Sequence, residues 1–318
     1  MTGRIPLLFA VCALLGAGCG DDATVGDAGP RPDAMVDAVT TDTGPLPTSC
    51  PSGDAIPDRE GFMGPCCYRK SNAGDLANPE LRLAGVSITS PTSLGNPIIS
   101  AALAAALDEE RFNWLIKIAG ADADGEVTID TGFGFRDPGP TYRFANNDAP
   151  AAGGDPARWN PLMAMATITG ESISAPPLMG SFTVPIIEED GTSVVLELPL
   201  QNLSLQMLTL SEDRSCVGVR RPTSYSTMDG SLTTYITVAD SLVGRVMLPP
   251  IDTSLCNVIA GQPTEPMRCE TEPQEMWAVP PDSMCLGGTC TAGACAVAEC
   301  NAWQIVGGFA AHGVEITP

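Results

Sequence analysis

Apolar and polar residues alternate along much of the middle of the chain, and this alternation limits the fold more than any other feature. A period of two places successive side chains on opposite faces of a strand, so that one face is buried and the other is wet. The alternation is clear in segments 127–135, 182–186, 194–200 and 232–238. It predicts a mostly β protein, an antiparallel β-sandwich or jelly-roll-like domain with one or two short helices. A β-helix is the alternative, but the sequence shows no repeat of fixed length to support it.

The clearest of these segments changes phase. Its apolar residues occupy even-numbered positions from Val194 to Leu200 and odd-numbered positions from Leu203 to Met207. A slip of one residue exchanges the two faces of a strand. We therefore expect a bulge, bend or tight turn near Gln201 and Asn202.

Two helices and one further strand are expected between the alternating segments. Asn96 is a suitable N-cap, Pro97 suits the first helical position, and apolar residues then recur with helical spacing up to about Arg111. A strand is expected over residues 112–118, and a second short helix over residues 253–260.

The cysteines indicate an oxidising compartment. The chain has 12 cysteines and no Cys-x2-Cys pair, which argues against a structural zinc site. Ten of them are disulfide candidates: Cys50, Cys66, Cys67, Cys216, Cys256, Cys269, Cys285, Cys290, Cys295 and Cys300. Adjacent cysteines bond to each other only through a strained turn, so Cys66 and Cys67 are expected to have different partners, with a vicinal redox pair as the alternative.

The N-terminal residues have the layout of an export signal. Arg4 precedes an uncharged apolar run over residues 5–15, and small residues directly precede Cys19. The run is too short to cross roughly 30 Å of hydrocarbon, so we expect it to be cleaved. Residues 15–19, Leu-Gly-Ala-Gly-Cys, resemble the lipobox of bacterial lipoproteins. The resemblance implies that Cys19 is lipidated and becomes the amino terminus.

Cysteine parity favours lipidation over ordinary cleavage after Gly18, which is the alternative. Removing Cys12 with the signal and assigning Cys19 to the lipid leaves 12 − 2 = 10 cysteines, which can all pair. Gly16 stands where the lipoprotein family usually has leucine. Gly20 stands where an aspartate commonly retains lipoproteins at the inner membrane, so the resemblance implies an outer-membrane lipoprotein, facing either the periplasm or the cell surface.

Composition divides the chain into six parts. The head, residues 49–80, is rich in glycine, proline and cysteine, and the tether before it is acidic and lacks aromatic residues, which predicts disorder. Residues 313–317 are expected to form a last strand in the same sheet as residues 85–89. The parts are a signal peptide (1–18), a tether (19–48), a disulfide-held head (49–80), a β body (81–262), a Cys-rich excursion (263–302) and a C-terminal strand (303–318).

Few residues offer catalytic chemistry. His312 is the single histidine, and we place it on the edge of the last strand. A Ser-His-Asp hydrolase would depend on it, with Ser172 as the nearest approach to a nucleophile motif. Because Ser172 lies in a strand pattern and lacks the final glycine of that motif, a surface histidine and a strand serine are favoured, and no catalytic residue is assigned.

Single residues suggest two binding chemistries. Asp122 and Asp124 are candidate ligands for a weakly bound calcium ion, but the strongest ligand positions of a calcium loop are missing, and a hairpin turn explains them better. Trp159 and Tyr142 are the best loop aromatics for stacking on a sugar. No cofactor or other metal is expected.

The formal net charge of −22 makes nucleic acid a poor partner. The expected partners are a membrane, reached through the lipid, and a glycan or an envelope protein. The sequence therefore favours an exported, lipid-anchored binding or structural module of the cell envelope. An extracytoplasmic hydrolase acting on envelope or extracellular polymers is the alternative.

Overall fold

A computed structural model gives the fold of residues 77–137, 141–146, 156–187, 193–206, 208–211, 214, 216–217, 220–221, 224–225, 230–248, 251–261, 268–293 and 295–318. The expected signal peptide, the tether and all but the last residues of the head lie outside these residues. So do Cys19, Cys50, Cys66 and Cys67.

The described residues are mainly β-structure. In the first half, the elements are β1 (Glu80–Ser90), α1 (Pro97–Asp108), β2 (Trp114–Ala119), β3 (Gly125–Arg136), β4 (Thr141–Phe144), the 3-10 helix η2 (Pro156–Trp159), β5 (Leu162–Thr169), β6 (Ser172–Ser174) and β7 (Ser181–Ile187). Next come β8 (Val194–Gln206), β9 (Leu208–Thr209), β10 (Cys216–Val217), β11 (Arg220–Arg221), β12 (Ser224–Tyr225) and β13 (Gly230–Thr237). The last are α2 (Val238–Val243), β14 (Arg245–Leu248), β15 (Ile251–Ser254), α3 (Leu255–Ile259), α4 (Arg268–Thr271), η3 (Gln274–Met276), β16 (Ser283–Leu286), β17 (Thr289–Ala292), β18 (Ala302–Gly313) and β19 (Glu315–Thr317).

Most of the strands join one connected sheet whose pairings form a closed circuit. The circuit runs from β1 through β2, β3, β5 and β6 to β9, the next strand after β8 in the chain. From β8 it passes to β13, then to β18, and returns to β1. Every pairing in this circuit is antiparallel, which confirms the predicted fold class.

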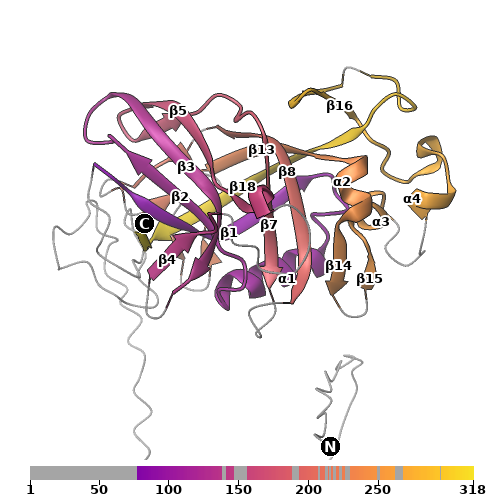
Figure 1. The fold of residues 1–318 in the computed structure, drawn as a ribbon, viewed down its shortest axis with the longest axis horizontal. Coiled ribbons are helices and arrows are strands. Elements are labelled where there is room, and N and C mark those ends of the chain that lie inside the picture. The colour runs from indigo at the N-terminus through magenta and orange to yellow at the C-terminus, as the bar shows by residue number, and fades with distance from the viewer. Residues whose placement is uncertain are drawn as a thin grey trace, which may run out of the picture. The chain divides into compact units, whose positions relative to one another are not determined.

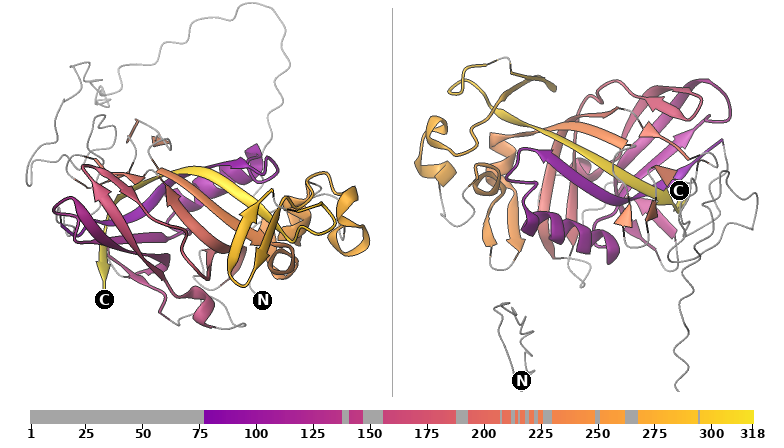
Figure 2. Two further views of the ribbon diagram at one scale, coloured as in Figure 1. Left: turned by 90° about the horizontal axis from the view of Figure 1, so that it is seen from above. Right: turned by 180° about the vertical axis from the view of Figure 1, so that it is seen from behind.

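The sheet curves around one large apolar core, and β18 crosses the body from the Cys-rich β16–β17 hairpin toward the C terminus (Figures 1 and 2). Inward-facing positions of β3 and β7 are buried, as their alternation predicts. Trp114 of β2 packs edge-to-face on Phe182 of β7, with ring centres 5.4 Å apart. The core thus joins strands that are not neighbours in the sheet.

The phase change in β8 is a bulge, as predicted. The strand is continuous, but Asn202 has a φ of 51°, in the left-handed region. The register with β13 shifts between Thr233 and Tyr235 at the same level. The bulge lets both halves of β8 turn their apolar residues toward the core.

Helix α1 begins where the sequence predicts. The Asn96 side chain accepts hydrogen bonds from the backbone N–H groups of Ile98 and Ile99. The helix ends at Asp108, earlier than the expected Arg111, because Glu110 has a φ of 58° and reverses the chain. Helix α3 lies within the predicted range 253–260.

Two of the four α-helices were not predicted. The alternation of β13 suggested a strand through Val238, but α2 begins at that residue. The Thr237 hydroxyl accepts a hydrogen bond from the backbone N–H of Asp240, and this N-cap ends the strand. Helix α4 carries Cys269, whose backbone N–H donates to the Asn257 side chain.

The two ends of the body meet in the connected sheet. β18 pairs with β1, and the last strand, β19, pairs in parallel with β4. The predicted association of residues 313–317 with residues 85–89 therefore holds at the level of the sheet, although these two segments do not pair directly.

Candidate functional site

Three charged side chains from neighbouring strands form a row on the outer face of the sheet, away from the core. Glu80 in β1 stands directly opposite Lys117 in β2, and Lys117 stands opposite Asp130 in β3. Residues directly opposite each other in antiparallel strands point to the same face. We call Glu80, Lys117 and Asp130 the charged row.

Both oxygens of Glu80 are engaged. Oε1 lies 2.8 Å from Lys117 Nζ. Oε2 accepts a hydrogen bond of 2.7 Å from the backbone N–H of Ile316 in β19. Partial burial raises the pKa of the Asp130 carboxyl above its ordinary value, and the positive charge of Lys117 opposes that shift. Two carboxylates therefore flank one ammonium group in a partly desolvated setting.

Two exposed methionines extend this face. Met163 in β5 stands opposite Asp130, and Met165 stands opposite Thr128. Their exposed fractions are 73% and 49%, although both lie within a regular strand of the sheet. The Thr128 hydroxyl contacts the Met165 sulfur at 3.7 Å. We call Met163 and Met165 the methionine pair.

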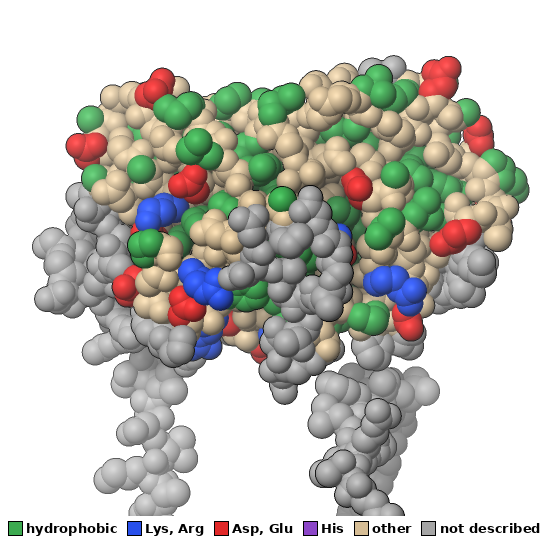
Figure 3. All heavy atoms as spheres, in the orientation of Figure 1, with side chains coloured by type: hydrophobic (Ala, Val, Ile, Leu, Met, Phe, Trp, Pro, Cys, Tyr) green, Lys and Arg blue, Asp and Glu red, His purple; other side chains and the backbone are tan. Residues whose placement is uncertain are grey.

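Apolar side chains reach the surface at several separate points of the face shown in Figure 3. The methionine pair differs from scattered exposure because the strand register fixes it beside the charged row. Scattered single apolar residues are normal on protein surfaces, whereas an ordered group next to fixed charges offers both apolar and polar contacts.

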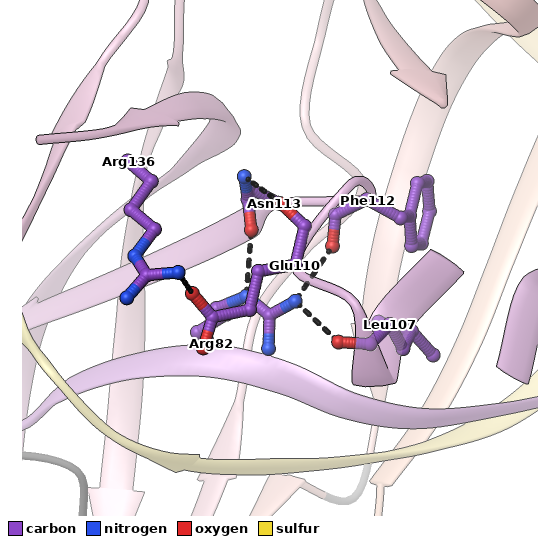
Figure 4. Close-up of polar contacts among 6 residues, drawn as sticks. All are labelled: Arg82, Leu107, Glu110, Phe112, Asn113 and Arg136. Carbon is purple, nitrogen blue, oxygen red and sulfur yellow. Dashed lines mark hydrogen bonds and ion pairs between the residues drawn. The ribbon is translucent and has the colours of Figure 1, made fainter. Parts of the chain in front are cut away.

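A second polar cluster surrounds the buried Arg82 of β1 (Figure 4). Its Nε donates to Asn113 Oδ1 at 2.7 Å, and one terminal nitrogen donates to the carbonyls of Leu107 at 2.6 Å and Phe112 at 3.3 Å. These carbonyls belong to the last turn of α1 and the chain that follows it. The guanidinium group therefore fixes the end of α1 to the sheet, which is a structural role.

The same cluster extends to Tyr142 of β4 and to an ion pair between Arg136 and Glu110. The Arg82 guanidinium carbon lies 5.8 Å from the centre of the Tyr142 ring. Burial raises the pKa of the Tyr142 hydroxyl, and the charges of Arg82 and Arg136 oppose the shift. Arg136 Nη1 lies 2.7 Å from Glu110 Oε2 (Figure 4).

The residues considered for a hydrolase lie on different strands that do not pair. His312 is 5% exposed, so the prediction of a surface histidine on a strand edge is wrong. It is buried because β18 has partners on both sides, with Arg82 opposite on β1 and Cys216 opposite on β10. Ser172 begins β6, as the strand pattern predicted, and is exposed next to the turn from β5.

Asp122 and Asp124 lie in the turn of the β2–β3 hairpin, where the hairpin interpretation placed them. Asp124 Oδ1 accepts a hydrogen bond of 2.8 Å from the backbone N–H of Gly170, in the β5–β6 turn. Within the described ranges, no three His, Cys, Asp or Glu side chains gather as a metal ion would require.

Trp159 and Tyr142, the best loop candidates for stacking on a sugar, are both buried, so neither ring is exposed to a sugar. Trp159 ends η2 and packs edge-to-face on Phe133, with ring centres 6.1 Å apart, while Arg158 covers its ring. The loop composition around these residues suggested exposure, but the two rings fill core space. The large hydrophobic side chains that are exposed in the described part of the chain are aliphatic residues and methionines.

Six of the ten disulfide candidates form three described bonds. Cys285 and Cys290 stand opposite each other in the β16–β17 hairpin. Cys295 bonds to Cys300, and these two bonds confirm the predicted stapled loop. The third bond joins Cys256 of α3 to Cys269 of α4. Cys216 is also disulfide-bonded.

Sequence reasoning missed the charged row, although its members have polar positions in alternating strands. Lys117 is the single charged residue of β2, and Asp130 occupies a polar position between the apolar residues of β3. Those signals mark an outer face. The row itself depends on the register of β1, β2 and β3, which the sequence does not reveal.

No helix of the described residues has the length and apolar character needed to cross a membrane. Comparison with family models, with curated proteins and with solved structures finds no match for this chain.

Proposed function

We propose that this chain is an exported lipoprotein of the bacterial outer membrane, anchored through Cys19, whose β domain is a binding module. The anchor is supported by the lipobox-like segment 15–19 and by the even number of cysteines that remain once Cys12 and Cys19 are removed. The acidic segment that follows has the composition of a spacer between the lipid and the domain.

The outer face of β2, β3 and β5 is the contact surface of this module. The exposed methionine pair beside the charged row is the observation that carries this proposal. Methionine side chains are flexible and polarisable, and they adapt to apolar partners at binding surfaces. Lys117 and Asp130 supply charged contacts beside the methionine pair.

The partner that fits this surface is a protein of the cell envelope. Sugar rings usually stack on exposed aromatic faces, and the exposed apolar groups here are methionines and aliphatic residues. The Ser-His-Asp form of the hydrolase alternative has no support in the described residues, because His312 is buried opposite Arg82 and Ser172 lies on a strand that does not pair with β18.

Site-specific photocrosslinking in intact envelopes tests the contact surface. A photoreactive amino acid at position 165 is expected to give a discrete adduct, whereas the same group at position 276 is not. Met276 is a matched control, since it is also a methionine with a 64% exposed side chain and lies in η3. The M163K/M165K variant, with the photoreactive group at position 167, should lose the adduct. Equal adducts at positions 165 and 276 would contradict a specific surface.

The anchor has its own test. Mass spectrometry of the mature protein should find diacylglycerol on the Cys19 sulfur, and C19A should move the protein from the membrane fraction to the soluble fraction. An unmodified Cys19 at the mature N terminus would contradict the proposed lipid anchor. It would not bear on the proposed contact surface.

A further inference from the structure

The methionine pair presents two thioether sulfurs on one face of β5. Met163 and Met165 are separated by one residue of the strand, so both side chains point outward and their Cα atoms are about 6.7 Å apart. The next two outward positions of the strand hold exposed threonines, Thr167 and Thr169, as the wet face of an alternating strand usually does. The two methionines are exposed as well, so their sulfurs are available to solvent instead of filling the core.

Thioether sulfur has a distinct ligand chemistry. It is a soft donor that selects Cu(I), whereas carboxylate and carbonyl oxygens suit Mg²⁺, Ca²⁺ and Mn²⁺. It also carries no proton, so a metal ion does not have to displace one, as it does from a thiol. Two exposed thioethers on one strand therefore favour a soft monovalent cation over hard divalent cations.

The spacing of the pair allows both sulfurs to reach one ion. A metal–sulfur bond like that of zinc to cysteine is about 2.3 Å long, so two sulfurs on the same ion are at most about 4.6 Å apart. Each methionine has three rotatable bonds and can close the difference from the Cα spacing. Thr128 stands opposite Met165, and its hydroxyl contacts the Met165 sulfur at 3.7 Å. This contact places that sulfur toward β3, the strand that carries Asp130.

A carboxylate lies beside the two sulfurs. Asp130 stands directly opposite Met163 and points to the same face, which puts the two Cβ atoms about 4.5–5.5 Å apart. Lys117, the cation of the charged row, makes its close ion pair of 2.8 Å with Glu80, on the far side from the methionines. The row holds two carboxylates and one ammonium group, so its border with the methionine pair attracts a cation.

We propose that Met163, Met165 and Asp130 form a binding site for one soft monovalent cation of the Cu(I) class. The two sulfurs bind the ion, and the carboxylate balances its charge. The ion keeps its oxidation state, and no bond within the protein is made or broken. Structural zinc sites are enclosed by four protein ligands, whereas this site leaves the ion open to water, which suits reversible capture at the surface. The site depends neither on the lipid anchor nor on a protein partner.

A titration of the purified mature protein with silver ion tests the site. Ag(I) has the charge and the filled d shell of Cu(I) and is stable in air. The protein is alkylated at any free thiol, labelled with carbon-13 at its methionine methyl groups and titrated with silver nitrate in chloride-free buffer. The methyl signals of Met163 and Met165, assigned through M163L and M165L, should shift together and saturate at one equivalent of silver.

Matched controls isolate the contribution of the pair. Met276 is 64% exposed and has no second methionine two residues away, so its signal should not move at one equivalent. M163L/M165L keeps the volume and apolar character of both side chains, so the fold should persist while the one-equivalent binding is lost. D130N should keep both shifts but weaken binding about tenfold, as the loss of a group around a ligand set does. Anaerobic competition with bicinchoninate should rank the variants in the same order for Cu(I).

Three results would overturn the proposal. A Met165 shift that is unchanged in M163L would mean that the two sulfurs do not share an ion. A Met276 shift at the same silver concentration would mean that any exposed thioether suffices, and displacement of silver by Ca²⁺ would mean that carboxylates are the ligands. These measurements use the purified protein alone and do not bear on the lipid or on adducts formed in intact envelopes, so failure of the site and failure of the proposed function are distinguishable.

Discussion

The Oδ1 atom of Asn202 accepts a hydrogen bond of 3.3 Å from the backbone N–H of Cys290, a residue 88 positions further along the chain. Asn202 forms the bulge of β8, and Cys290 lies in the stapled β16–β17 hairpin. The bulge therefore does more than shift the phase of β8. It turns a buried amide toward the hairpin and connects the Cys-rich part of the chain to the body.

Substitutions at Asn202 should separate two contributions to stability, that of its side-chain hydrogen bond and that of its left-handed backbone conformation. N202G keeps the left-handed backbone accessible but removes the side-chain acceptor, and we expect the free energy of unfolding to fall by about 1 kcal/mol. N202A adds the cost of a left-handed residue with a Cβ atom, for a total of roughly 2–3 kcal/mol. Urea denaturation measures both values. If N202A were as stable as N202G, the strained backbone would not matter.

Arg82 should be far more important to stability than an exposed arginine. R82M leaves the carbonyl oxygens of Leu107 and Phe112 without their charged donor, so we expect a loss of more than about 3 kcal/mol. R245Q breaks an exposed ion pair with Asp252 and should cost less than about 1 kcal/mol. Chemical denaturation of both variants checks the difference, and similar losses would contradict the role given to Arg82.

Asp130 should make stability depend on acid pH. Because its pKa is raised in the folded state, the folded protein holds the proton more tightly than the unfolded chain. The free energy of unfolding should then fall as the pH rises through and above the ordinary aspartate pKa of about 4, and D130N should lack this contribution. The stability of D130N relative to the parent should therefore increase over that range. K117M removes the opposing charge, so it should move the decline to higher pH. A constant difference between D130N and the parent would show that the carboxyl is not perturbed.

Two of the three described disulfides, Cys256–Cys269 and Cys285–Cys290, should differ in how much they stabilise the fold. The Cys256–Cys269 bond spans 13 positions and the Cys285–Cys290 bond spans 5. Loop-closure entropy gives about 3 kcal/mol for the first and about 2 kcal/mol for the second. The double variants C256A/C269A and C285A/C290A, compared by urea denaturation, should follow that order. The reverse order would mean that packing in the hairpin dominates over loop closure.

The sequence predicted features that depend on local chemistry. The phase change around Asn202, the N-cap at Asn96 and the stapled cysteines near the end all required only short segments to interpret. The strand character of Ser172 and the core position of alternating residues in β3 follow from the same local rule. Helix α2 was missed because the Thr237 cap competes with an alternation that continues through Val238.

Features that depend on distant strands were not predictable from one sequence. The burial of His312 depends on β1 and β10, which pair with β18 on either side and lie far from it in the sequence. The local sequence around Tyr142 and Trp159 is typical of loops. Both rings are buried because β4 and η2 pack onto the body. The charged row requires the register of three strands, and its partners Glu80 and Lys117 lie 37 positions apart (117 − 80).

The pairing of β1 with β18 also dictates when folding can finish. During synthesis β1 emerges first, and its partner β18 begins 222 positions further along the chain (302 − 80). Until β18 arrives, the inner side of β1 and the strands beside it keep apolar surface and unpaired backbone groups in contact with water. The domain therefore closes only once β18 has emerged, and until then the free edge of β1 can pair with other chains.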